Sequence, residues 1–125
     1  MKFLHTMIRV ADIEKSLEFY QNILGLKLDR TKELPDATLY FLTDEAGCSE
    51  IELTYNHTLP EGGYELGNYF GHLAFQTDNM DKFSEILKQH GLAYFRPPFK
   101  ITAVGSTIAF IKDPDGIQIE IIEKK

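Results

Sequence analysis

Asp113-Pro114-Asp115-Gly116-Ile117-Gln118-Ile119-Glu120 is a turn followed by a short alternating strand, and the chain carries a second version of it. Asp, Pro and Gly favour a tight turn, and the alternation puts Glu120 on the opposite face from its isoleucine neighbours. A shift of 69 residues places Asp44 and Gly47 on Asp113 and Gly116, and with one residue deleted Ile51-Glu52 falls on Ile119-Glu120. The sequence therefore predicts a repeated hairpin whose second strand carries a glutamate.

The repeat extends toward the N-terminus of each copy. A shift of 67 places His5 on His72, Lys15 on Lys82 and Glu18 on Glu85. We interpret the 125 residues as one domain built of two modules, about residues 1–57 and 71–125, joined by a loop rich in Gly and Pro. Modules of about sixty residues bury little surface alone, so each is expected to need a neighbour.

Both modules predict the same order of elements. Alternating apolar residues predict strands over residues 4–10 and 72–77. Helices follow, one starting after the N-cap Asp12 and stopping at Gly25, the other over residues 80–90 between Asn79 and Gly91. Further strands are predicted over residues 38–42, 50–55, 107–111 and 117–122. Pro97-Pro98 is predicted to mark a loop.

Four side chains form the candidate metal site. His5 and Glu52 are 47 residues apart, and His72 and Glu120 are 48 apart. A single His at a strand start is usually structural or solvated, but two in register with two Glu favour a metal site. Imidazole and carboxylate suit Zn, Ni, Co or Fe, and two carboxylates balance the charge of a divalent ion.

Composition and charge disfavour several classes of partner. A net charge of −6 and a pI near 5.1 disfavour nucleic acid and anionic membranes. No apolar run approaches the ~18 residues of a membrane span, and no signal-peptide segment follows Met1-Lys2. Cys48 is the sole cysteine, so no structural disulfide is expected. We expect a cytoplasmic protein with a small-molecule substrate.

Local motifs narrow the interpretation. The βαβββ order and the four ligands resemble the vicinal oxygen chelate superfamily, and four segments are similar to the glyoxalase I (lactoylglutathione lyase) family over nearly the whole chain. These are Leu4-His5-Thr6-Met7-Ile8-Arg9-Val10, Ile51-Glu52-Leu53-Thr54-Tyr55-Asn56, Gly71-His72-Leu73-Ala74 and residues 113–120. The resemblance implies an α+β fold of two tandem βαβββ modules forming a curved mixed sheet or half-barrel.

The resemblance also implies an activity. It is the isomerisation of the methylglyoxal–glutathione hemithioacetal to S-lactoylglutathione, by proton transfer through a metal-stabilised enediolate. One divalent metal per site, Ni²⁺ or Co²⁺ in preference to Zn²⁺, would be held by His5, Glu52, His72 and Glu120. Glu120 is expected to be the catalytic base, with Glu52 serving the opposite face. A homodimer is implied, with the metal shared within one chain or across the interface.

Arg9 and Asn56 match the family's glutathione-binding positions. Arg9 shares a strand face with His5, and a salt bridge to Glu50 or Glu52 is the alternative interpretation. Asn56 follows Glu52 by two residues on its strand, and a turn residue is the alternative there. The family pattern is incomplete, because Asn68 stands where some members have Arg and Lys100 aligns imperfectly with a family Lys.

Two other functional classes fit the same fold. One is another metalloenzyme of the superfamily, such as an acyl-CoA epimerase, a dioxygenase or a thiol transferase. The other is a metal-free drug-binding protein. His57 and His90 have no repeat mate, and we assign them no catalytic role.

Overall fold

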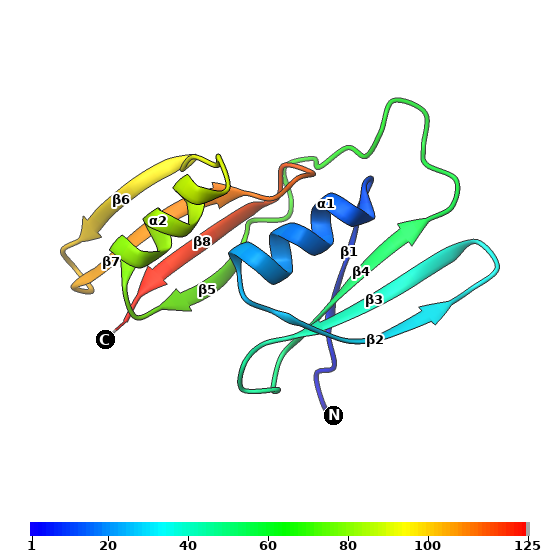
Figure 1. Ribbon diagram of the computed structural model, residues 1–125, viewed down its shortest axis with the longest axis horizontal. Helices are drawn as coiled ribbons and strands as arrows, with labels where there is room; N and C mark the ends of the chain where they lie inside the picture. The colour runs from blue at the N-terminus through cyan, green and yellow to red at the C-terminus, as the bar shows by residue number, and fades with distance from the viewer. Residues whose placement is uncertain (125) are drawn as a thin grey trace. The chain divides into compact units, whose positions relative to one another are not determined.

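The computed structural model describes residues 1–124, which divide into two compact units, residues 1–65 and 66–124 (Figure 1). The unit boundary falls inside the loop that the sequence predicts between the modules. Each unit contains one four-stranded mixed sheet and one α-helix. The predicted α+β class with two βαβββ modules is confirmed.

The first unit contains β1 (Thr6–Arg9), α1 (Ile13–Glu18), a π-helical turn (Phe19–Ile23), β2 (Lys27–Glu33), β3 (Ala37–Thr43) and β4 (Glu50–Asn56). Its strand order is β1-β4-β3-β2, with β1 parallel to β4 and the other neighbours antiparallel. Its core includes the fully buried Val10, Tyr20, Leu42 and Leu53. Parallel pairing of β1 with β4 aligns the start of the module with its last strand.

The second unit repeats this topology with β5 (Leu73–Thr77), α2 (Met80–Gln89), β6 (Arg96–Ile101), β7 (Ser106–Lys112) and β8 (Gln118–Glu123). Its order is β5-β8-β7-β6, with β5 parallel to β8. The apolar face of α2 buries Met80, Phe83 and Leu87, and Figure 1 draws the helix across this sheet. Met80 N–H donates to Glu123 Oε1, which ties the start of α2 to the end of β8.

Both helices begin as the sequence predicts. Asp12 Oδ1 accepts from Lys15 N–H at 3.1 Å, and Asn79 Oδ1 accepts from Lys82 N–H at 2.9 Å. The first helix is shorter than predicted, because a π-helical turn replaces its second half. This wider turn lets the adjacent Phe19 and Tyr20 both be buried, at 4% and 0% exposure.

The prediction of a loop at Pro97-Pro98 is wrong. Both prolines lie in β6, and the strand assignments from sequence also omitted β2. β6 is an edge strand, and a proline there, which lacks an N–H, loses no hydrogen bond on the side that has no neighbouring strand. The register of β6 with β7 also shifts between Arg96 and Phe99. The irregular register accommodates the two rings while Phe99 and the residues after it pair with β7.

The two hairpin turns are held by aspartates, as the motif predicts. Asp44 Oδ1 accepts from the N–H groups of Cys48 and Ser49, and Asp113 Oδ1 accepts from those of Asp115 and Ile117. Gly116 adopts φ +92°, which L residues with a side chain rarely reach. Each turn directs the chain into the strand that carries a candidate glutamate ligand.

Among residues 1–124, neither helix has the length and apolar character needed to cross a bilayer.

Ser16 provides a test of packing in α1. Its side chain is fully buried, and its hydroxyl has no hydrogen-bond partner among residues 1–124. A buried unpaired hydroxyl costs about 1–3 kcal/mol, so Ser16→Ala should raise the free energy of unfolding by about 1 kcal/mol, measured by urea denaturation.

Ser84 in α2 is the matched control. Its hydroxyl contacts Met80 O at 2.9 Å and Tyr94 Oη at 2.7 Å, so Ser84→Ala should lower stability by about 1 kcal/mol. Equal destabilisation by both alanines would contradict the assignment of Ser16 as unpaired.

Candidate metal and substrate site

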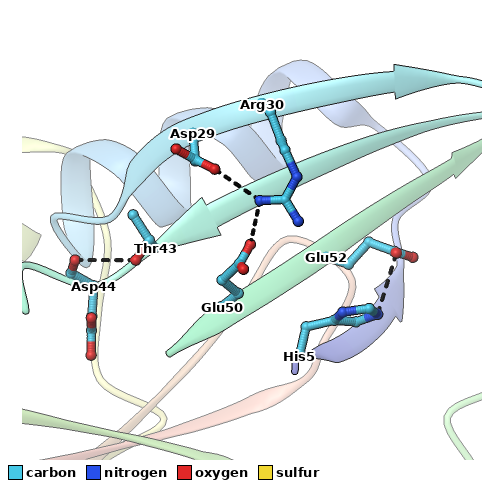
Figure 2. Close-up of polar contacts among 7 residues, drawn as sticks. All are labelled: His5, Asp29, Arg30, Thr43, Asp44, Glu50 and Glu52. Atoms are coloured by element: carbon cyan, nitrogen blue, oxygen red, sulfur yellow. Dashed lines mark hydrogen bonds and ion pairs between the residues drawn. The ribbon is translucent and has the colours of Figure 1, made fainter. Parts of the chain in front are cut away.

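His5 and Glu52 meet at one edge of the first sheet. His5 directly precedes β1, and Glu52 lies on β4 opposite Met7. His5 Nε2 is 3.4 Å from Glu52 Oε1, as Figure 2 shows. Glu52 Oε2 also accepts from Thr54 Oγ1 at 2.7 Å, and the glutamate is 8% exposed. The carboxylate is therefore fixed at both oxygens.

His72 and Glu120 repeat this arrangement in the second unit. His72 Nε2 is 3.1 Å from Glu120 Oε2, and the histidine again directly precedes a strand that pairs in parallel with the glutamate's strand. The side chains are 42% and 16% exposed. The sequence repeat is thus a repeat of side-chain geometry.

A phenylalanine completes each arrangement. Phe41 lies opposite Glu52 across β3 and β4, and its ring meets the His5 ring edge-on, with centroids 5.6 Å apart at 81°. Phe110 lies opposite Glu120, and its ring meets His72 at 5.6 Å and 79°. Each histidine is therefore held between a carboxylate and an aromatic ring.

The donor atoms in each unit fit a divalent metal. Two ligands ~2.1 Å from one ion lie ~3.0 Å apart in octahedral and ~3.4 Å apart in tetrahedral coordination. The separations of 3.4 and 3.1 Å lie in this range, and each pair offers imidazole nitrogen and carboxylate oxygen. Among residues 1–124 no cluster of three or more His, Cys, Asp or Glu side chains occurs, so each unit supplies two candidate ligands.

Arg9 is exposed on β1 opposite Thr54. The alternative salt bridge to Glu50 or Glu52 is not formed, because Glu50 pairs with Arg30 and Glu52 contacts His5. Within residues 1–124 the Arg9 guanidinium makes no ion pair. It is therefore available to bind an anion.

Asn56 is the last residue of β4, opposite Ala37, and is not a turn residue. Tyr64 Oη donates to Asn56 Oδ1 at 3.2 Å. Because the amide oxygen is occupied, the amide N–H₂ group is left to donate to an acceptor. No sequence feature pointed to Tyr64, which lies in the Gly-rich loop outside any strand or helix.

Two arginines were also missed. A shift of 66 residues places Arg30 on Arg96, and each lies opposite the phenylalanine that contacts a candidate histidine ligand. Hydrogen bonds to Glu50, which has the larger effect, and to Asp29 raise the pKa of Arg30 above its ordinary value. The repeat could have identified both residues, but not their different partners.

The remaining histidines stand apart from the two pairs. His57 Nε2 lies 2.9 Å from Thr38 Oγ1, which donates to Glu33, and His90 Nδ1 contacts Ile86 O. These contacts fix the end of β4 and the end of α2. That neither histidine has a catalytic role stays a prediction.

Comparisons with known proteins support one family. The family model of the Glyoxalase/Bleomycin resistance protein/Dioxygenase superfamily matches residues 2–121. A lactoylglutathione lyase of Neisseria meningitidis is 43% identical, covering 100% of this chain and 92% of that protein. The resemblance to glyoxalase I is confirmed.

Solved structures give the same result. Glyoxalase I from Zea mays has a TM-score of 0.84 at 34% identity, covering 97% of this chain, which spans 44% of the maize chain. The trypanothione-dependent glyoxalase I of Leishmania major has a TM-score of 0.75 at 32% identity, covering 98% of this chain and 86% of that one. The chain therefore belongs to the Glyoxalase/Bleomycin resistance protein/Dioxygenase superfamily.

Proposed function

We propose that this protein is a metal-dependent lactoylglutathione lyase that isomerises the methylglyoxal–glutathione hemithioacetal to S-lactoylglutathione. The comparisons confirm the predicted reaction class, because relatives 42–43% identical over the whole chain are lactoylglutathione lyases. The observation that carries the proposal is the duplicated His–Glu pair. Such duplication supplies four ligands of the type that a divalent ion requires.

His5, Glu52, His72 and Glu120 would hold one divalent metal, joined within one chain or across a homodimer. When bound, the ion supplies Lewis acidity that stabilises negative charge on the two vicinal oxygens of the substrate. Two carboxylates and two neutral imidazoles leave the site close to neutral. Ni²⁺ or Co²⁺ is our first choice, with Zn²⁺ as the alternative.

The two glutamates differ in how firmly they are held. Glu52 is fixed by His5 and by the Thr54 hydroxyl. Glu120 faces His72, and the position equivalent to Thr54 is Ile122, which offers no hydroxyl. The Glu120 carboxylate therefore has more freedom to take a proton from one carbon and return it to the next. Glu120 is the proposed base, with Glu52 on the opposite face of the substrate.

Arg9 and Asn56 are proposed to bind the thiol carrier. A guanidinium without an internal partner suits a carboxylate, and the Asn56 amide presents donors to a carbonyl or carboxylate oxygen. Glutathione carries both kinds of acceptor. The relative from Leishmania major depends on trypanothione, so the assay should compare glutathione with trypanothione as the thiol. A cytoplasmic location is proposed with this substrate.

Metal removal tests the reaction. Protein stripped of metal should lose isomerase activity, and adding Ni²⁺, Co²⁺ or Zn²⁺ separately should restore it and rank the ions, measured by formation of the thioester product. Stoichiometric metal binding without activity toward the glutathione or trypanothione hemithioacetal would favour another metalloenzyme of the superfamily. Failure to take up any of the three ions would favour a metal-free binding protein.

Glu120→Gln tests the base. The amide cannot accept the proton but retains an oxygen ligand, so kcat should fall by about 10²-fold or more while the metal stays bound. Glu123→Gln on the same strand is the control and should keep near-normal kcat, because Glu123 contacts the start of α2 rather than His72. Full activity of Glu120→Gln would exclude this residue as the base.

Tyr64→Phe tests the binding role of Asn56. Loss of one hydrogen bond worth about 1 kcal/mol should raise KM about five-fold with kcat unchanged, measured by steady-state kinetics. Tyr69→Phe is the matched control, because the Tyr69 side chain is fully exposed. An unchanged KM in Tyr64→Phe would show that the Tyr64 hydrogen bond does not orient Asn56 for substrate binding.

A further inference from the structure

Arg30 lies beside the ligand pair of the first unit without contacting either ligand. Its Nη1 donates to Glu50 Oε2 at 2.7 Å and to Asp29 Oδ2 at 2.8 Å, reaching from β2 to β4 (Figure 2). Its guanidinium carbon is 4.0 Å from the centroid of the Phe41 ring. Phe41 is 7% exposed and meets His5 edge-on. Arg30, Phe41 and His5 thus form a continuous row of contacts, here called the stack, in which the cation lies over the Phe41 ring and His5 meets that ring edge-on.

His5 lies outside the strand that follows it, so its ring needs support from neighbouring side chains. It precedes β1, and the pairing of β1 with β4 begins only at Thr6 opposite Ile51. Its side chain is 32% exposed. The strand therefore does not fix the His5 ring, whose orientation is set by Glu52 on one side and Phe41 on another.

The stack is specific to the first unit. Arg96, at the equivalent position, places its guanidinium 3.9 Å over Phe99 and not over Phe110, which contacts His72. Gln118 stands at the position of Glu50, and Phe95 at that of Asp29. Within residues 66–124 Arg96 has no carboxylate partner. The carboxylates of Glu50 and Asp29 are therefore what hold Arg30 over the ring that contacts the histidine.

We propose that Arg30 is a positioning residue for His5, acting through the Phe41 ring. The proposal rests on the function proposed above, in which His5 is a metal ligand. The cation attracts the face of the Phe41 ring and fixes its plane, and the ring in turn limits rotation of the imidazole. Outer groups that orient a histidine ligand commonly contribute 10- to 100-fold to metal affinity.

The Arg30–Glu50 pair also determines which carboxylate lies next to His5. Glu50 and Glu52 lie two residues apart on β4 and share one face of the strand. With its Oε2 bonded to Arg30, Glu50 is held toward β2 (Figure 2). Glu52 is then the carboxylate that faces His5.

The experiment compares Arg30→Met with the wild type by two measurements. Nickel affinity, measured by isothermal titration calorimetry, should fall about 10-fold. In the metal-free protein, nuclear Overhauser contacts between the His5 and Phe41 rings should be lost or weakened. Phe41→Leu should reproduce the loss of affinity, and Arg30→Lys should recover part of it by restoring the cation. Lys32→Met, an exposed cation on the same strand, is the control and should bind nickel like the wild type.

The outcomes separate this proposal from the function on which it rests. Unchanged affinity and unchanged ring contacts in a folded Arg30→Met variant would overturn the positioning role. Wild-type protein that binds no nickel, cobalt or zinc would overturn the proposed metalloenzyme, whatever the ring contacts show. If Arg30→Met loses stability, Arg30→Lys decides, because equal affinity losses in Lys and Met variants would also overturn the role of the stacked cation.

Discussion

Parallel pairing of the first and last strands in each module is the constraint on which the site depends. β1 pairs with β4, and β5 pairs with β8, so the residue that precedes the first strand lies beside the start of the last. A glutamate on that last strand is then within reach of the histidine. Antiparallel pairing of the preceding strand adds a phenylalanine opposite the glutamate. One topology, used twice, produces the two equivalent His–Glu–Phe arrangements.

Duplication does not make the two modules chemically equal. In the first unit Thr54 fixes the glutamate, and Glu50 with Asp29 fixes an arginine over the phenylalanine. In the second unit the equivalent positions hold Ile122, Gln118 and Phe95, which supply no carboxylate or hydroxyl. The first pair is thus surrounded by more supporting polar contacts than the second. This difference supports separate roles for the glutamates, a firmly held ligand and a carboxylate free to transfer a proton.

Much of the fold was predictable because its signals are local. Asp12 and Asn79 cap the helices, and Asp44 and Asp113 hold the turns, through contacts within a few residues of each aspartate or asparagine. The predictions for β2 and β6 failed for a related reason. Both are edge strands, β2 is exposed along its length, and β6 contains Pro97-Pro98, so alternation and strand propensity were weak guides.

The sequence by itself determined the two modules, the His5–Glu52 and His72–Glu120 pairs and the family, because a repeat of ligand residues at matched spacing is visible without a structure. Only the tertiary structure decided which neighbours support those residues. Arg30 donates a hydrogen bond to Glu50, 20 residues away in sequence. Tyr64 donates to the Asn56 amide oxygen, 8 residues away. Such contacts depend on strand register and side-chain direction, which residue types alone do not specify.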